Sequence, residues 1–477
     1  MKQANAGPHS GLHLVICALC ALLIGACLWT MMEQPAMYAA QPSLARRSSG
    51  QLQPTDLRYQ GAFAYPIGDE WAYSGHALAY YPGGDAGGPN DGYPGSLYAA
   101  GLNPDRLVGE MSIPAPVITK DFESLPRATV LRPLADITGG WRDNCTAEPG
   151  CEYVEVAGLA YLDNVDKIAW NLRDWYNAAA RDQDSLGWSN RDYSGAQGVW
   201  HIGPRENAVF HNAKTTNYLF KAPLAFANQH LGGKWLLTGN ARPAGAVGGS
   251  QGPTIYATAP WQDGNPPASG QNLAALALLY YPTVAECIDK PTQCHFPGYR
   301  AADEWGGAVW LEGGGKSAVV IMGRKGLGDN CYGTPGTECP ASTCVPDKGW
   351  VAAPYEAQML FYDPADLLAV VAGTKEPWQV LPYTIHRPAG NLFEPTCGDL
   401  RDVTYDAARQ LIYVAERDGG PNGETIVHVW RVEAGPDPTP TATPTGSAPT
   451  PSPTATAVAT PAATPAARLF VPFVQRR

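Results

Sequence analysis

The chain has 477 residues, a formal net charge of -11 and a sequence pI near 5.3. An acidic surface of this kind argues against nucleic acid as a partner. The composition includes 52 Gly, 44 Pro, 14 Trp and 23 Tyr but only 16% charged residues. Such a composition favours short strands and turns over long amphipathic helices, so we expect an all-β protein.

Residues 1–45 are predicted to be a signal peptide or an N-terminal membrane anchor. Residues 12–32 are almost wholly apolar and follow Lys2. A membrane-spanning helix needs about 20 apolar residues, whereas the apolar part of a signal peptide is about 7 to 15 residues long. Three routes stay open: a retained anchor, cleavage near Ala36–Ala40, and lipidation of Cys27 in a lipobox-like Ile-Gly-Ala-Cys sequence. Each route places the body outside the cytoplasm, with membrane contact only through this segment.

Residues 51–435 form the predicted folded domain, in which short apolar segments alternate with turns rich in Gly, Pro, Asn and Asp. Four units of four segments are followed by one unit of three. The segments are 75–81, 96–100, 107–113 and 127–134; 156–161, 167–175, 186–189 and 198–202; 218–230, 234–239, 254–259 and 273–281; 306–311, 316–323, 357–362 and 379–385; and 400–406, 411–418 and 426–433. Short helices are predicted within 218–230 and over 364–373.

The fifth unit lacks an outer strand, and Leu57–Tyr65 is a strand without a unit of its own. Pairing this strand with residues 426–432 closes the ring and leaves no open sheet edge. We therefore predict a five-bladed β-propeller. Six or seven blades are the alternative, because about 75 residues per unit exceed the roughly 40–50 of common propeller repeats.

The final unit resembles the repeats of secreted bacterial β-propeller proteins of the NHL and YVTN types. The resemblance is carried by the short strands Asp402–Asp406 and Leu411–Glu416, followed by a V-x-V-x-x-V segment. It implies the propeller fold and no particular activity, because propellers host many unrelated functions.

Eight cysteines lie in the folded body, and their even number suits an exported protein. We expect two local disulfides, Cys145–Cys151 and Cys287–Cys294, because each pair lies in a loop with Pro or Gly. The other four allow three pairings: Cys331, Cys339, Cys344 and Cys397. A zinc site is the alternative for these four, but they lack the two-residue spacing and a nearby His pair.

Residues 436–467 are predicted to be a disordered stalk, because Pro, Thr, Ala and Ser cannot bury enough apolar surface to fold. Residues 468–477 form a short tail that is apolar and basic. Together the two segments look like the C-termini of bacterial surface proteins. A plain disordered tail is the alternative.

Residues that open the innermost strands are the first candidates for a site at the mouth of a propeller channel. They are His76, Gly158, Asp303, Glu304, Trp305, Arg401 and Asp402. Two carboxylates among Asp303, Glu304 and Asp402 could flank a sugar bond and act as acid and base or nucleophile. The structural alternative is that these groups are satisfied by backbone amides and water.

Aromatic residues near polar side chains offer a second candidate site, for a glycan. Trp175, Asn177 and Trp188 could hold a sugar by ring stacking, although Trp also fills cores. Calcium could bind the loops 85–92 and 418–424, which also work as turns. No sequence motif is specific enough to identify a catalysed reaction. The sequence favours a ligand-binding or scaffold domain with a glycan or cell-surface protein as partner, and the alternative is a glycoside hydrolase.

Overall fold

Five antiparallel sheets are arranged as the blades of a propeller. The computed structural model describes residues 50–88, 91–102, 107–142, 154–174, 181–240, 249–261 and 266–435, all within one compact unit. The segments 1–45, 436–467 and 468–477 lie outside these residues, as do Cys145, Cys151, Trp175 and Asn177. The predictions made for them stay predictions.

Each blade is built from four antiparallel strands, ordered from an inner strand to an outer one, and β13 (Asn272–Leu273) adds a fifth strand to the sheet of blade 2. Blade 1 contains β2 (Leu78–Tyr81), β3 (Ser96–Ala100), β4 (Val108–Ser112) and β5 (Val130–Ala135); blade 2 contains β6 (Val154–Leu162), β7 (Lys167–Asp174), β8 (Leu186–Ser189) and β9 (Gln197–Ile202); blade 3 contains β10 (Leu219–Lys221), β11 (Leu236–Thr238), β12 (Ile255–Thr258) and β14 (Ala275–Leu279); blade 4 contains β15 (Glu304–Gly313), β16 (Lys316–Gly326), β19 (Tyr355–Tyr362) and β20 (Thr384–His386); blade 5 contains β21 (Leu400–Asp406), β22 (Leu411–Glu416), β23 (Ile426–Val432) and β1 (Leu57–Ala64). The five blades and their boundaries confirm the predicted repeat.

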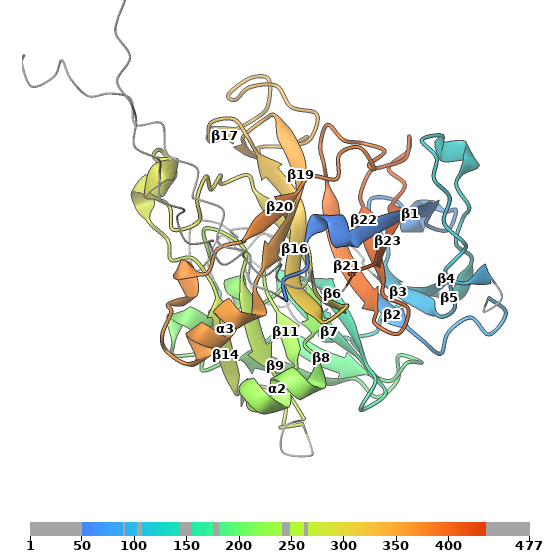
Figure 1. Cartoon of the computed structure of the whole chain (residues 1–477), viewed down its shortest axis with the longest axis horizontal. Coiled ribbons are helices and arrows are strands. Elements are labelled where there is room, and N and C mark those ends of the chain that lie inside the picture. The colour runs from blue at the N-terminus through green and yellow to red at the C-terminus, as the bar shows by residue number, and fades with distance from the viewer. Residues whose placement is uncertain are drawn as a thin grey trace, which may run out of the picture. The chain divides into compact units, whose positions relative to one another are not determined.

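The N-terminal strand closes the ring, as predicted. β1 pairs antiparallel with β23, from Leu57 opposite Val432 to Ala64 opposite Ile426, with a bulge between Tyr59 and Gly61. Figure 1 shows β1, in blue, beside the orange-red strands of the chain's last blade. The last blade is therefore built from both ends of the folded domain.

The inner strands β2, β6, β10, β15 and β21 form a closed circle, in which each contacts the next and β21 also contacts β2. The inner strands of neighbouring blades are not joined by a ladder of backbone hydrogen bonds. Side chains therefore accept hydrogen bonds from some of their backbone N–H groups. Asp402 Oδ2 accepts from the backbone N–H of Leu78 at 2.8 Å, and Thr404 Oγ1 accepts from that of Tyr80 at 2.9 Å. These bonds join blade 5 to blade 1.

Glycine permits a close approach of two inner strands. A Cβ atom on Gly307 of β15 would lie 2.7 Å from the carbonyl oxygen of Arg401 on β21. Only a residue without a side chain allows this backbone spacing. The ring can therefore close at this point only if Gly306 and Gly307, near the start of β15, carry no side chain.

The core consists of apolar layers between neighbouring blades. Phe63, Leu97 and Tyr413, for example, belong to one buried cluster that joins blades 5 and 1. Alternating apolar residues of each strand supply these layers. The periodicity that defines the strands therefore also defines the contacts between blades.

Further elements lie in the connections. Both predicted helices are confirmed, as α2 (Leu224–His230) and α3 (Pro364–Val371). The sequence did not reveal β13 (Asn272–Leu273), which pairs parallel with β9, or the hairpin of β17 (Cys331–Gly333) and β18 (Gly349–Val351). No helix in the described part of the chain is long and apolar enough to cross a membrane.

Three disulfides join the described cysteines. Cys287–Cys294 is confirmed, and the four remaining cysteines pair as Cys331–Cys339 and Cys344–Cys397. The zinc alternative for these four is therefore wrong, because a disulfide sulfur is not a thiolate ligand.

Candidate functional site

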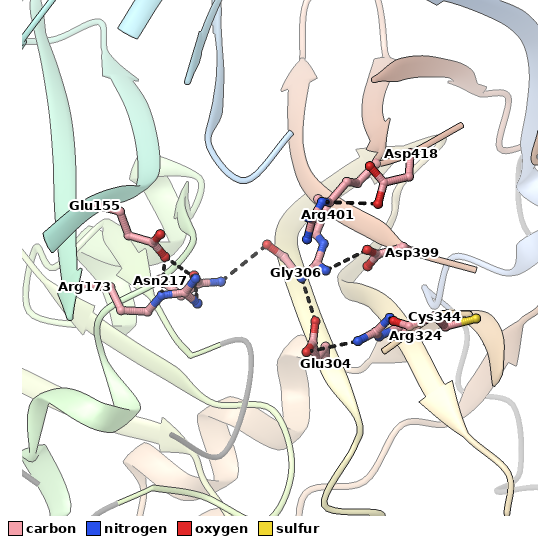
Figure 2. Close-up of polar contacts among 11 residues, drawn as sticks. Glu155, Arg173, Asn217, Glu304, Gly306, Arg324, Cys344, Asp399, Arg401 and Asp418 are labelled. Atoms are coloured by element: carbon pink, nitrogen blue, oxygen red, sulfur yellow. Dashed lines mark hydrogen bonds and ion pairs between the residues drawn. The ribbon is translucent and has the colours of Figure 1, made fainter. Parts of the chain in front are cut away.

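The inner strands all begin at one end of the channel, which we call the amino mouth. Two arginines and two carboxylates meet there in ion pairs that are buried or half-buried (Figure 2). Arg401 lies 2.7 Å from Glu304 and 2.7 Å from Asp399, and Arg324 lies 3.2 Å from Glu304. Burial would lower the pKa of Arg401, but Asp399 and Glu304 hold it above the ordinary value. Glu304, a candidate acid, is thus fully engaged by two guanidinium groups.

A second group of contacts joins blades 2, 3 and 4 at the same mouth. Arg173 Nε donates to Glu155 at 2.8 Å, and its Nη1 donates to Asn217 at 2.9 Å. Asn217 in turn donates to the carbonyl of Gly306 at 3.5 Å, as Figure 2 shows. Polar side chains therefore bridge the blades around this end of the channel.

The two other candidate carboxylates are fully buried. Asp303 accepts from Lys325 Nζ at 2.8 Å and from the backbone N–H of Gly326 at 2.9 Å. Asp402 accepts from the backbone of Leu78 and Val403. Burial raises the pKa of both carboxyl groups. These partners satisfy the acids without a substrate, which is the structural alternative set out from the sequence.

The candidate aromatic and histidine residues are also buried. Trp305 is 2% exposed and His76 is 7% exposed. Trp188 is 4% exposed, donates from its indole N–H to Gln197 at 2.6 Å and stacks on Trp261 at a centroid distance of 5.7 Å. Both tryptophans fill the core. Arg401 lies among the ion pairs described above.

A disulfide-bonded insertion between β16 and β19 is attached to the amino mouth. Arg324 Nη1 donates to the carbonyl of Cys344 at 2.9 Å, and Cys344 is bonded to Cys397 just before β21. Arg300 Nε also donates to the carbonyl of Gly328 at 2.5 Å. The insertion thus fixes the charged cluster in place.

The opposite end of the channel, the carboxyl mouth, holds a cavity of about 410 Å³. All five inner strands line it, and each contributes one aromatic side chain near its end. These mouth aromatics are Tyr80, Tyr161, Phe220, Trp310 and Tyr405. Leu159, Val309 and Val403 add apolar wall between them. A mostly apolar concave site with a few polar groups is the usual form of a small-molecule site.

Charged groups lie around this cavity. Asp163 and Lys221 form an ion pair of 3.3 Å. Asp406 accepts from the backbone N–H groups of Ala408 and Arg409 at 3.0 and 3.2 Å. Burial raises the pKa of the Glu312 carboxyl group.

Sequence reasoning missed this mouth because it examined the residues that open the inner strands. The signal that could have revealed it is positional. In four of the five inner strands the aromatic residue is the last but one, as in Tyr161 of β6 and Tyr405 of β21.

The calcium prediction concerns two loops. The loop 85–92 lies partly outside the described residues. In the loop 418–424, Glu424 accepts from the backbone N–H of Asn422 at 2.7 Å. Within the described ranges, no three His, Cys, Asp or Glu side chains are grouped to hold a metal ion.

No family model matches the chain, and no curated protein matches it. Among solved structures it is similar to the Dos1 propeller, with 11% identity, a TM-score of 0.25, and coverage of 76% of this chain and 70% of that one.

Proposed function

We propose that this five-bladed propeller is a non-enzymatic binding domain that takes its ligand at the carboxyl mouth. The observation that carries the proposal is the 410 Å³ cavity, to which all five blades contribute an aromatic residue. The contrast with the amino mouth supports it, because Glu304 and Arg401 there are engaged with each other.

The proposal places the domain outside the cytoplasm. Disulfides persist in oxidising compartments, and the three described ones suit export. Residues 1–45 supply the export signal or anchor in this proposal, and residues 436–467 act as a spacer. The partner is a small molecule, or a side chain or glycan presented by a cell-surface molecule, small enough to enter the cavity.

The test is a binding screen with the full chain and a variant whose cavity is covered. Ala408 is exposed on the rim, so Ala408→Trp adds a large ring there without changing the core. Thermal-shift measurements against a library of small molecules and oligosaccharides should yield compounds that stabilise the wild type. The same compounds should not stabilise Ala408→Trp.

The matched control is Ala389→Trp, which adds the same ring at an exposed position that does not line the cavity. It should bind like the wild type. Hits that bind all three proteins equally would place the ligand elsewhere and overturn the proposal. Hydrolysis of an oligosaccharide by the wild type but not by Glu304→Gln would replace it with the glycoside hydrolase alternative.

A further inference from the structure

The carboxyl mouth presents ring carbon to its interior, since the hydroxyl groups of its tyrosines are engaged. Tyr405 donates to the carbonyl of Glu312 at 2.9 Å, and Tyr161 donates to Asp166 at 3.0 Å. Tyr80 donates to the carbonyl of Pro94 at 3.1 Å. With these contacts made, the three tyrosines among the mouth aromatics offer faces and edges of rings rather than free hydroxyl groups.

The lining of the cavity is acidic. Its charged members are three carboxylates and one cation: Asp163, Glu312, Asp406 and Lys221. Lys221 pairs with Asp163, and backbone N–H groups and Arg409 engage Asp406. In the described part of the chain, the carboxylate of Glu312 has no hydrogen-bond or ion-pair partner. One negative charge at the rim is therefore uncompensated.

Aromatic rings and an uncompensated carboxylate together select for one class of ligand. The face of an aromatic ring is electronegative and attracts a cation, most strongly when the cation carries little hydration of its own. A neutral sugar would need several hydrogen-bonding groups, which the tyrosines do not offer. An inorganic anion would be repelled by Glu312.

We infer that the carboxyl mouth binds an organic cation, such as an alkylated ammonium group, with its apolar part among the mouth aromatics and its charge facing Glu312. This inference rests on the proposed function and names the ligand class of the same site. The position of Glu312, two residues after Trp310 on β15, places ring and carboxylate on the same strand end.

The test compares choline with 3,3-dimethylbutan-1-ol, its uncharged isostere, by calorimetric titration of the full chain. The two probes have the same shape and differ in charge. Choline should bind roughly tenfold more tightly, given the strength of a desolvated cation–ring contact. Ala408→Trp should abolish the binding of both probes.

Glu312→Gln should lower the affinity for choline several-fold and leave that for the uncharged alcohol unchanged. Glu123→Gln, a change at an exposed residue that does not line the cavity, is the matched control and should alter neither. Equal affinity of the wild type for both probes would overturn the cation inference and leave the proposed binding site standing. If the wild type binds neither probe, the inference also fails, and the library screen decides the proposed function separately.

Discussion

Arg401 on β21 and Glu304 on β15 form a 2.7 Å ion pair between the inner strands of two neighbouring blades. The side chain of Arg401 is 7% exposed and also binds Asp399 at 2.7 Å. One buried cation thus serves two carboxylates where the last blade meets its neighbour.

Arg401→Met should destabilise the protein strongly, because it leaves the buried Asp399 without its cation and Glu304 with Arg324 as its remaining partner. Removal of one member of a buried pair costs about 3–5 kcal/mol. Urea unfolding followed by tryptophan fluorescence measures the loss.

The control for this change is Arg58→Met. Arg58 pairs with Glu433 at 3.4 Å, but the two side chains are 71% and 42% exposed. Exposed pairs contribute roughly 0–1 kcal/mol. Equal losses for the two variants would contradict a stabilising role of the buried cluster.

Gly61→Ala should weaken the closure of the ring. Gly61 has a φ of +122° at the bulge of β1, and a Cβ atom there would lie 2.5 Å from the backbone of Val117. We expect a loss of at least about 2 kcal/mol from strain and steric conflict. Gly390→Ala, with nothing within 4 Å of the added atom, should be nearly neutral in the same unfolding measurement. A stable Gly61→Ala protein would show that β1 tolerates a different path.

The two disulfides of the insertion should differ in their effect on stability. Cys344–Cys397 spans 53 residues, whereas Cys331–Cys339 spans 8. Because loop closure restricts the unfolded chain more for longer loops, replacement of each pair by serine should cost about 4 and about 2.5 kcal/mol, respectively. Unfolding of the two double variants tests the order. The reverse order would indicate that native contacts, rather than the unfolded chain, dominate.

His201 and Asp182 predict a pH dependence of stability. Burial would lower the pKa of His201, but its hydrogen bonds to Asp182 and the carbonyl of Gly203 raise it. The contribution of the protonated imidazole is therefore full below its unfolded pKa of about 6.5 and is lost as pH rises through the higher folded value.

Asp182 determines the low-pH end of the range in which this ion pair stabilises the protein. Burial would raise its pKa, but hydrogen bonds from His201 and the backbone of Asn212 lower it. Its contribution is present above its unfolded pKa of about 3.9 and is lost as pH falls through the lower folded value. The difference in unfolding free energy between the wild type and His201→Gln should be largest between pH ~4 and ~6.5. A difference that stays constant from pH 4.5 to 9 would contradict a charged pair.

Much of the fold could be predicted because its signals are local. The short apolar run of residues 411–415 and the turn residues around it identify β22 without any knowledge of its neighbours. Even the closure of the ring was predictable, since Leu57–Ala64 had no other unit to join and an open edge is unfavourable. The helix α3 was predicted from Asp366 in its first turn and Gly373 at its end, and the structure adds a cap from the Asp363 side chain to the N–H of Ala365.

The site could not be predicted, because it depends on which side chains meet when five distant strands converge. Glu304 and Asp402 look alike in sequence as acids that open inner strands. One meets two arginines and the other meets backbone N–H groups, because each faces a different neighbouring blade. Likewise Tyr80 and Tyr405, 325 positions apart, line one cavity only once the ring has closed. Strand periodicity is set by near neighbours in the chain, whereas the charge and shape of a mouth are set by contacts between blades.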